Sequence, residues 1–161
     1  MTPLRNAPSR QRGMVLLVSL VFLLLLTMLG ISSMQNASLQ EKMAGSVSLR
    51  NQTFQTAEAV LRVGESQINA TFQMAQCANA TACLPPTDST IVTRAGSGSG
   101  GAVTWVAVGD GGFYAIQNLG TTASPVQRPP NCSGSATLYR VTAVAIQGPS
   151  RTVLESIYAN C

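Results

Sequence analysis

The chain has 161 residues, of which 45% are hydrophobic but only 5% aromatic and 10% charged, and it contains no histidine. Charged residues reach about 25% in an average soluble protein, so this composition indicates a long apolar segment joined to a polar domain rich in small residues. The absence of histidine excludes a Ser-His-Asp triad and any histidine metal site. The six acidic residues are scattered and form no cofactor motif, so the sequence predicts a protein that is not an enzyme and holds no cofactor or metal.

The net charge of +4 is concentrated at the N-terminus, where Arg5, Arg10 and Arg12 lie. Without residues 1–13 the chain has seven basic and six acidic residues, a net charge of +1 (7 − 6). No basic run with interleaved aromatic residues is present either. We therefore expect no nucleic-acid partner.

An uncharged stretch runs from Gly13 to Gln40, and thirteen of the eighteen residues 14–31 are Leu, Val, Ile or Phe. As a helix, residues 14–31 would be about 27 Å long, close to the hydrocarbon thickness of a bilayer. The pattern predicts a single membrane-spanning helix over residues 14–34. The arginines before it favour a cytoplasmic N-terminus and a periplasmic C-terminus. A plain uncut anchor and a secretory signal cut after Ser32 are alternatives.

The helical pattern continues beyond the membrane segment, because apolar residues recur at roughly heptad spacing. They form a stripe of Leu39, Met43, Val47, Phe54, Leu61, Ile68 and Phe72. No proline occurs between Pro8 and Pro85. We therefore predict one helix over about residues 14–74, in which residues 35–76 are an amphipathic half whose stripe packs on a domain. A coiled-coil partner for the stripe is the alternative.

The composition changes near Cys77, and residues 77–161 are predicted to form a small antiparallel sheet laid on the second half of the helix. Four segments favour strands, namely 102–108, 112–118, 137–147 and 151–158, with turns at 109–112 and 148–150. Residues 95–101 and 121–131 are predicted to be loops. The core candidates are Trp105, Phe113 or Tyr114, Tyr139, Val141, Val153 and Ile157. The predicted fold class is α+β.

Four cysteines in an exported domain suggest disulfides, for which three connectivities exist. We favour Cys77–Cys83, which locks the helix end to the following loop, and Cys132–Cys161, which ties down the last strand. The second bond closes a loop that is worth about 3–4 kcal/mol in the chain-entropy model. A metal site built from all four cysteines is the rival interpretation, which their spacing and an oxidising compartment disfavour.

Two stretches carry a resemblance to a known family. Residues 11–20, QRGMVLLVSL, resemble the prepilin signal of type IV pilins and secretion pseudopilins. Residues 31–45, ISSMQNASLQEKMAG, together with Ala57-Glu58-Ala59, resemble the PilX family of minor pilins of Gram-negative type IV pili. The resemblance covers about residues 10–65 and implies a type IV pilin-like fold, a long helix packed on a small antiparallel sheet.

The resemblance also implies how the N-terminus is processed. A prepilin peptidase would remove residues 1–13 as a basic leader by cutting between Gly13 and Met14, and the new amino group of Met14 would be methylated. Two positions depart from the family pattern: Met14 stands where Phe is usual, and Val18 stands where Glu is usual. In major pilins that Glu pairs with the methylated amine of a neighbouring subunit.

The resemblance implies a minor pilin that waits in the inner membrane and then packs with other minor pilins and the major pilin. Because Val18 lacks the carboxylate, we hypothesise that this subunit meets no amine ahead of it and sits at or near the pilus tip. There it would join a priming complex that starts pilus assembly and supports twitching motility and adhesion; a tip adhesin is a further candidate partner. Alternatives are a pseudopilin of type II secretion, a DNA-binding competence pilin and a plain membrane-anchored periplasmic binding module.

Overall fold

The computed structural model describes residues 12–98, 103–126 and 132–161. The chain divides into two compact units, of which the first ends at Ser46 and the second comprises Val47–Cys161. Most of the predicted leader, residues 1–11, lies outside the described residues. So do residues 99–101 and 127–131 of the two predicted loops and residue 102 of the first predicted strand.

Helix α1 comprises Arg12–Ser66, so the prediction that it continues to about residue 74 is wrong. After Ser66 the chain forms turns, in which the Ile68 N–H bonds to the Glu65 carbonyl at 3.0 Å. The Asn69 side chain then accepts hydrogen bonds from the backbone N–H and the hydroxyl of Thr71. Such local side-chain bonds compete with the helix for the backbone. Ile68 and Phe72 pack in or against the core, but they lie in the turns after the helix. Their apolar spacing therefore made the predicted helix too long.

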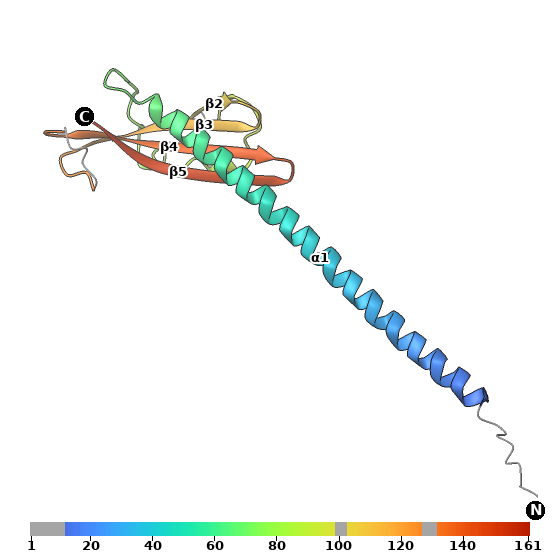
Figure 1. Ribbon diagram of the computed structural model, residues 1–161. Coiled ribbons are helices and arrows are strands. Elements are labelled where there is room, and N and C mark those ends of the chain that lie inside the picture. The colour runs from blue at the N-terminus through green and yellow to red at the C-terminus, as the bar shows by residue number, and fades with distance from the viewer. Residues whose placement is uncertain (1–11, 99–102, 127–131) are drawn as a thin grey trace, which may run out of the picture. The chain divides into compact units, whose positions relative to one another are not determined.

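Five antiparallel strands form one sheet in chain order, as Figure 1 shows for β2 to β5. The strands are β1 (Gly96–Ser97), β2 (Thr104–Val108), β3 (Gly112–Thr122), β4 (Ala136–Gln147) and β5 (Ser150–Asn160), and a short 3-10 helix, η1 (Thr87–Thr90), precedes them. The four predicted strands are therefore present. β1 lies where a loop was predicted, and β3 extends past residue 118 into the second predicted loop.

A bulge explains the unexpected length of β3. The pairing of β3 with β4 shifts between Asn118 and Gly120 and then continues to Thr122. Gly120 has φ +103°, a value that glycine adopts without strain, and its N–H bonds to the Asn118 side chain at 2.8 Å. The strand therefore resumes after one irregular residue instead of ending there.

The sheet buries residues on both faces, because neighbouring side chains of a strand point to opposite sides. One cluster contains Val60, Ile68, Tyr114, Ile116, Tyr139, Val141 and Ala143, and Figure 1 shows the end of α1 lying across the sheet. The other cluster contains Val92, Val103, Trp105, Phe113, Ala115 and Val144. Phe113 and Tyr114 are thus both core residues, one in each cluster.

Two predicted core residues are exposed. Val153 is 37% and Ile157 55% exposed, whereas the predictions for Trp105, Tyr139 and Val141 are confirmed. Val153 and Ile157 belong to β5, which is the last strand in the sheet order. They pair with Val144 and Arg140, so they share the face away from α1 at the margin of the sheet, where burial is incomplete.

The face of α1 that packs on the sheet is built mainly from residues outside the predicted stripe, of which only Leu61 contacts the sheet cluster from within the helix. Thr53 and Ala57 are fully buried and Val60 is 2% exposed. A side chain at Gly64 would place its Cβ 2.6 Å from Val141 Cγ1, so only glycine permits this approach of helix and sheet. Phe54, by contrast, is 49% exposed, and the prediction that it packs on the domain is wrong.

Candidate assembly surface

The first part of α1 is apolar and exposed. From Gly13 onward the helix is long and apolar enough to cross a membrane, with a mean hydropathy of 2.9 in its most apolar window and none of that window buried. The hydroxyls of Ser19 and Thr27 donate to the carbonyls of Leu16 and Leu24, at 2.9 and 2.8 Å. The two hydroxyl groups within residues 14–31 are therefore satisfied inside the helix, as a lipid environment requires.

The predicted processing and assembly positions all lie on this helix. Gly13 and Met14 fall in its first turn, and Met14 is 65% exposed. Val18 follows one turn later and is 47% exposed. Arg12 is the one charged residue between positions 11 and 40. The helix surface around Val18 therefore carries no carboxylate.

A second apolar surface continues along α1. It consists of Leu39, Met43, Val47 and Phe54, each between 49% and 70% exposed, and we call it the exposed row. These residues were predicted to face the sheet, but the small residues Thr53, Ala57 and Gly64 take that role. The exposed row is therefore not covered by the described part of the sheet. The heptad pattern favoured the core interpretation over a coiled-coil partner because it does not distinguish a core face from an intermolecular face.

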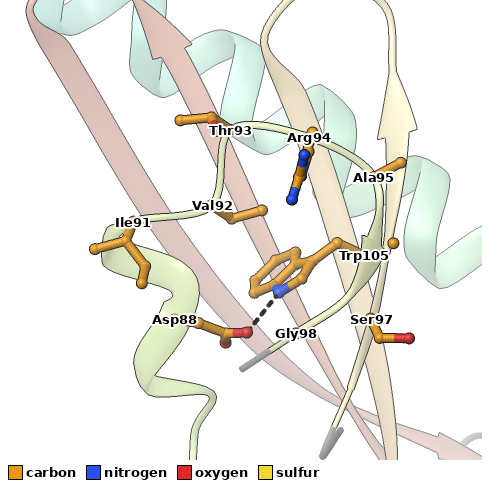
Figure 2. Close-up of a pocket in the computed structure, with 10 residues that line it drawn as sticks. Asp88, Ile91, Val92, Thr93, Arg94, Ala95, Ser97, Gly98 and Trp105 are labelled. Atoms are coloured by element: carbon orange, nitrogen blue, oxygen red, sulfur yellow. Dashed lines mark hydrogen bonds between the residues drawn. The ribbon is translucent and has the colours of Figure 1, made fainter. Parts of the chain in front are cut away.

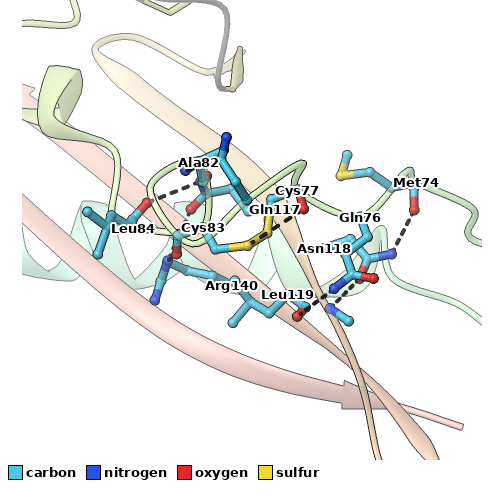
Figure 3. Close-up of a disulfide and its surroundings, with 12 residues drawn as sticks. Met74, Gln76, Cys77, Ala82, Cys83, Leu84, Gln117, Asn118, Leu119 and Arg140 are labelled. Carbon is cyan, nitrogen blue, oxygen red and sulfur yellow. Dashed lines mark hydrogen bonds between the residues drawn. A yellow bond between two sulfur atoms is a disulfide. The ribbon is translucent and has the colours of Figure 1, made fainter.

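The segment after α1 is fastened to the sheet by a disulfide and a set of polar contacts (Figure 3). Cys77 is bonded to Cys83, with Cα atoms 5.4 Å apart. Gln117 Nε2 donates to the carbonyls of Ala82 and Leu84, at 2.9 and 3.2 Å, and Arg140 donates to the Cys83 carbonyl. The loop of residues 77–84 is thus held rigidly on the sheet face away from α1.

The second disulfide joins Cys132 to Cys161, with Cα atoms 5.6 Å apart. Both bonds match the pairing that the sequence analysis favoured. Since no cysteine is free, the rival metal site of four cysteines is excluded. Among the described residues, no group of three or more His, Cys, Asp or Glu side chains could hold a metal ion.

A hollow lies beside Trp105, between η1 and β1 (Figure 2). Its one carboxylate among the lining residues, that of Asp88, is 3.1 Å from the Trp105 indole nitrogen, which donates to it. Both residues are buried. This hydrogen bond joins η1 to β2 and satisfies the indole N–H of the buried tryptophan. Its role is structural, and it does not indicate a ligand in the hollow.

Comparison with known proteins finds a family match for most of the helix. Residues 12–62 match the family described as PilX N-terminal. No curated protein and no solved structure matches the chain. The matched segment contains Val18, the exposed row and most of the face that packs on the sheet, and pilins are structural rather than catalytic proteins. Over this segment the chain is similar to the PilX-type minor pilins of type IV pili.

Proposed function

We propose that this minor pilin acts at or near the pilus tip, in a priming complex with other minor pilins that starts pilus assembly. The proposal rests on Val18. A valine at this position lacks the carboxylate with which a subunit pairs with the amine of the subunit ahead of it. A carboxylate at membrane depth costs about 2.5–3.5 kcal/mol on insertion scales. A subunit with nothing ahead of it gains nothing from that carboxylate, which fits an uncharged helix from Gly13 to Gln40.

The assembly step follows from the surfaces of α1. Lipid tails are as apolar as the helix, so the transfer from membrane to filament depends on close packing between helices rather than on the hydrophobic effect. The exposed residues 14–31 would make these contacts within the bundle, and the exposed row would extend them to the major pilin and other minor pilins. Twitching motility and adhesion, with a tip adhesin as a candidate partner, would depend on pili started in this way.

Processing is the first test of this function. A prepilin peptidase is expected to cut between Gly13 and Met14 and the new amine to be methylated, so intact mass and N-terminal sequencing of the membrane-bound protein should find a methylated Met14 start. A chain that still begins at Met1 would instead identify a plain anchored domain. A start near Ser33 would identify a secreted protein.

The role of Val18 is tested by Val18→Glu. The added carboxylate has no amine to meet, so we expect fewer surface pili and less of the priming complex, measured from sheared pili and from co-purified minor pilins. Val18→Ile keeps the apolar surface and serves as the matched control. Unchanged piliation and complex formation in Val18→Glu would show that position 18 does not assign the tip role.

A pseudopilin of type II secretion is the competing assignment. Deletion of the gene distinguishes the two: the proposed function predicts loss of surface pili with secretion intact. Loss of secretion with normal pili would favour the pseudopilin.

A further inference from the structure

A second hollow, of about 270 Å³, lies between the sheet and the segment that follows α1. Its floor is a row across three strands, because Thr121 of β3 pairs with Thr137 of β4, which in turn pairs with Asn160 of β5. Directly paired residues place their side chains on one face of a sheet. Tyr139 follows two residues after Thr137 and belongs to the cluster that α1 covers, so the row lies on that same face.

The wall of the hollow is held in place by hydrogen bonds between the sheet and residues 69–76. Asn118 Nδ2 donates to the Met74 carbonyl at 2.7 Å (Figure 3). Asn160 Nδ2 donates to the Asn69 carbonyl at 2.9 Å. The wall is therefore already positioned before any ligand arrives, and a preformed site loses little conformational freedom when it binds.

The hydroxyl of Tyr139 lacks a hydrogen-bond partner among the described residues, although this residue is only 3% exposed. A buried tyrosine usually finds a partner for its hydroxyl. This hydroxyl is not sealed inside the protein, because in the described part of the chain Arg140 Nε is the fully buried side-chain nitrogen or oxygen that has no partner. Tyr139 lines the hollow, so we assign its hydroxyl to the floor.

Further polar groups around the hollow are available to a ligand. The hydroxyls of Thr121 and Thr137 and the amide of Gln73 form no hydrogen bond with another described residue, and the amide oxygen of Asn160 is also unpaired there. None of the described lining residues is Asp, Glu, Lys or Arg. A charged ligand would meet no side chain of opposite charge among them, whereas ligand hydroxyls can both donate to and accept from these groups.

We propose that this hollow binds one neutral sugar ring of a glycan. Its volume is close to the lower limit of small-molecule sites, about 300 Å³, which suits a single ring. Phe72 also lines it and packs edge-on against Tyr139, with ring centroids 5.4 Å apart. An aromatic surface beside hydroxyl and amide groups fits a saccharide, which combines dense hydroxyls with an apolar C–H face. The site goes beyond the proposed function and does not depend on where the subunit lies in a pilus.

Saturation-transfer NMR on the full chain in dodecylphosphocholine micelles tests the site. This detergent is chosen because it carries no sugar that would compete for the hollow. The probes are the methyl β-glycosides of glucose, galactose and N-acetylglucosamine, with glucuronate as the anionic comparison. We expect a neutral glycoside to bind with a Kd of about 1 mM, the affinity that a ligand of this size reaches at ordinary ligand efficiency. Glucuronate should bind more weakly than that glycoside.

Two variants test whether binding occurs in the hollow. Tyr139→Phe and Thr137→Val each remove one hydroxyl from the floor and keep the shape of the side chain. Each should weaken the binding of that glycoside about fivefold, the effect of one lost hydrogen bond. Tyr114→Phe is the matched control, because Tyr114 belongs to the same core cluster as Tyr139 but is not among the lining residues; its Kd should be unchanged. Unfolding temperatures show that all three variants are folded.

Three results would overturn this inference. They are the absence of binding by all three neutral glycosides, binding of glucuronate as tight as theirs, and an unchanged Kd in folded Tyr139→Phe and Thr137→Val. Each would mean that the hollow is not a site for a neutral sugar. Each would also leave the proposed function intact, because that function is tested separately by the start of the mature chain and by Val18→Glu.

Discussion

Gly64 shows how one residue sets the distance between α1 and the sheet. The position is buried against Val141 and Tyr114, and glycine is retained there despite its low helix propensity. The gain lies in close approach of the helix to β3 and β4. A larger side chain would force the helix away from the cluster that contains Val60 and Tyr139.

Gly64→Val is therefore expected to destabilise the domain by about 1–3 kcal/mol, the usual range for overpacking. Thermal unfolding of the full chain in detergent, followed by the fluorescence of Trp105, measures the change. Gly45→Val is the matched control, since a Cβ at Gly45 meets nothing within 4 Å. Equal unfolding temperatures for the two variants would show that the close approach at Gly64 does not matter.

Among the elements, the two disulfides act on loops of very different length. The bonds span sequence separations of 6 for Cys77–Cys83 and 29 for Cys132–Cys161. The chain-entropy model gives about 2 kcal/mol for the short loop and about 3.5 kcal/mol for the long one. The short loop is also held by Gln117 and Arg140, which remain after its disulfide is removed.

The double variant Cys132→Ser with Cys161→Ser should thus lose more stability than Cys77→Ser with Cys83→Ser. Urea unfolding under identical conditions measures both free energies of unfolding. A larger loss from the short loop would mean that the polar contacts on Gln117 and Arg140 depend on the disulfide rather than acting beside it.

Periodicity predicted which elements form but not which of their faces are buried. The four strands were found because alternating and β-branched residues are a local signal, and the helix because its apolar repeat is long. Most of the packed face of α1 was missed, Leu61 excepted, because a hydrophobic pattern gives weight to Phe54, whereas close contact selects Thr53, Ala57 and Gly64. Val153 was misplaced for a related reason: an edge strand alternates just as a central strand does.

At the scale of the whole molecule, the sequence predicted site residues that lie close together in the chain better than contacts between distant residues. Gly13, Met14 and Val18 lie in one short motif and could be identified without a fold, although their roles remain proposals. The contacts that hold the 77–84 loop could not be predicted, because Gln117 and Arg140 meet carbonyls 33 to 57 residues earlier in the chain. Only the folded sheet brings these groups together.

The order of the disulfides along the chain has a consequence for export. The first cysteine is bonded to the second and the third to the fourth, so the bonds neither cross nor enclose one another. If the chain beyond the membrane helix is exported in sequence order, with the N-terminus retained in the cytoplasm, then Cys77 and Cys132 each meet their partner as the next thiol to arrive. An oxidase that joins successive thiols as they appear would yield the native connectivity directly, so we expect maturation of this subunit to need no disulfide isomerase.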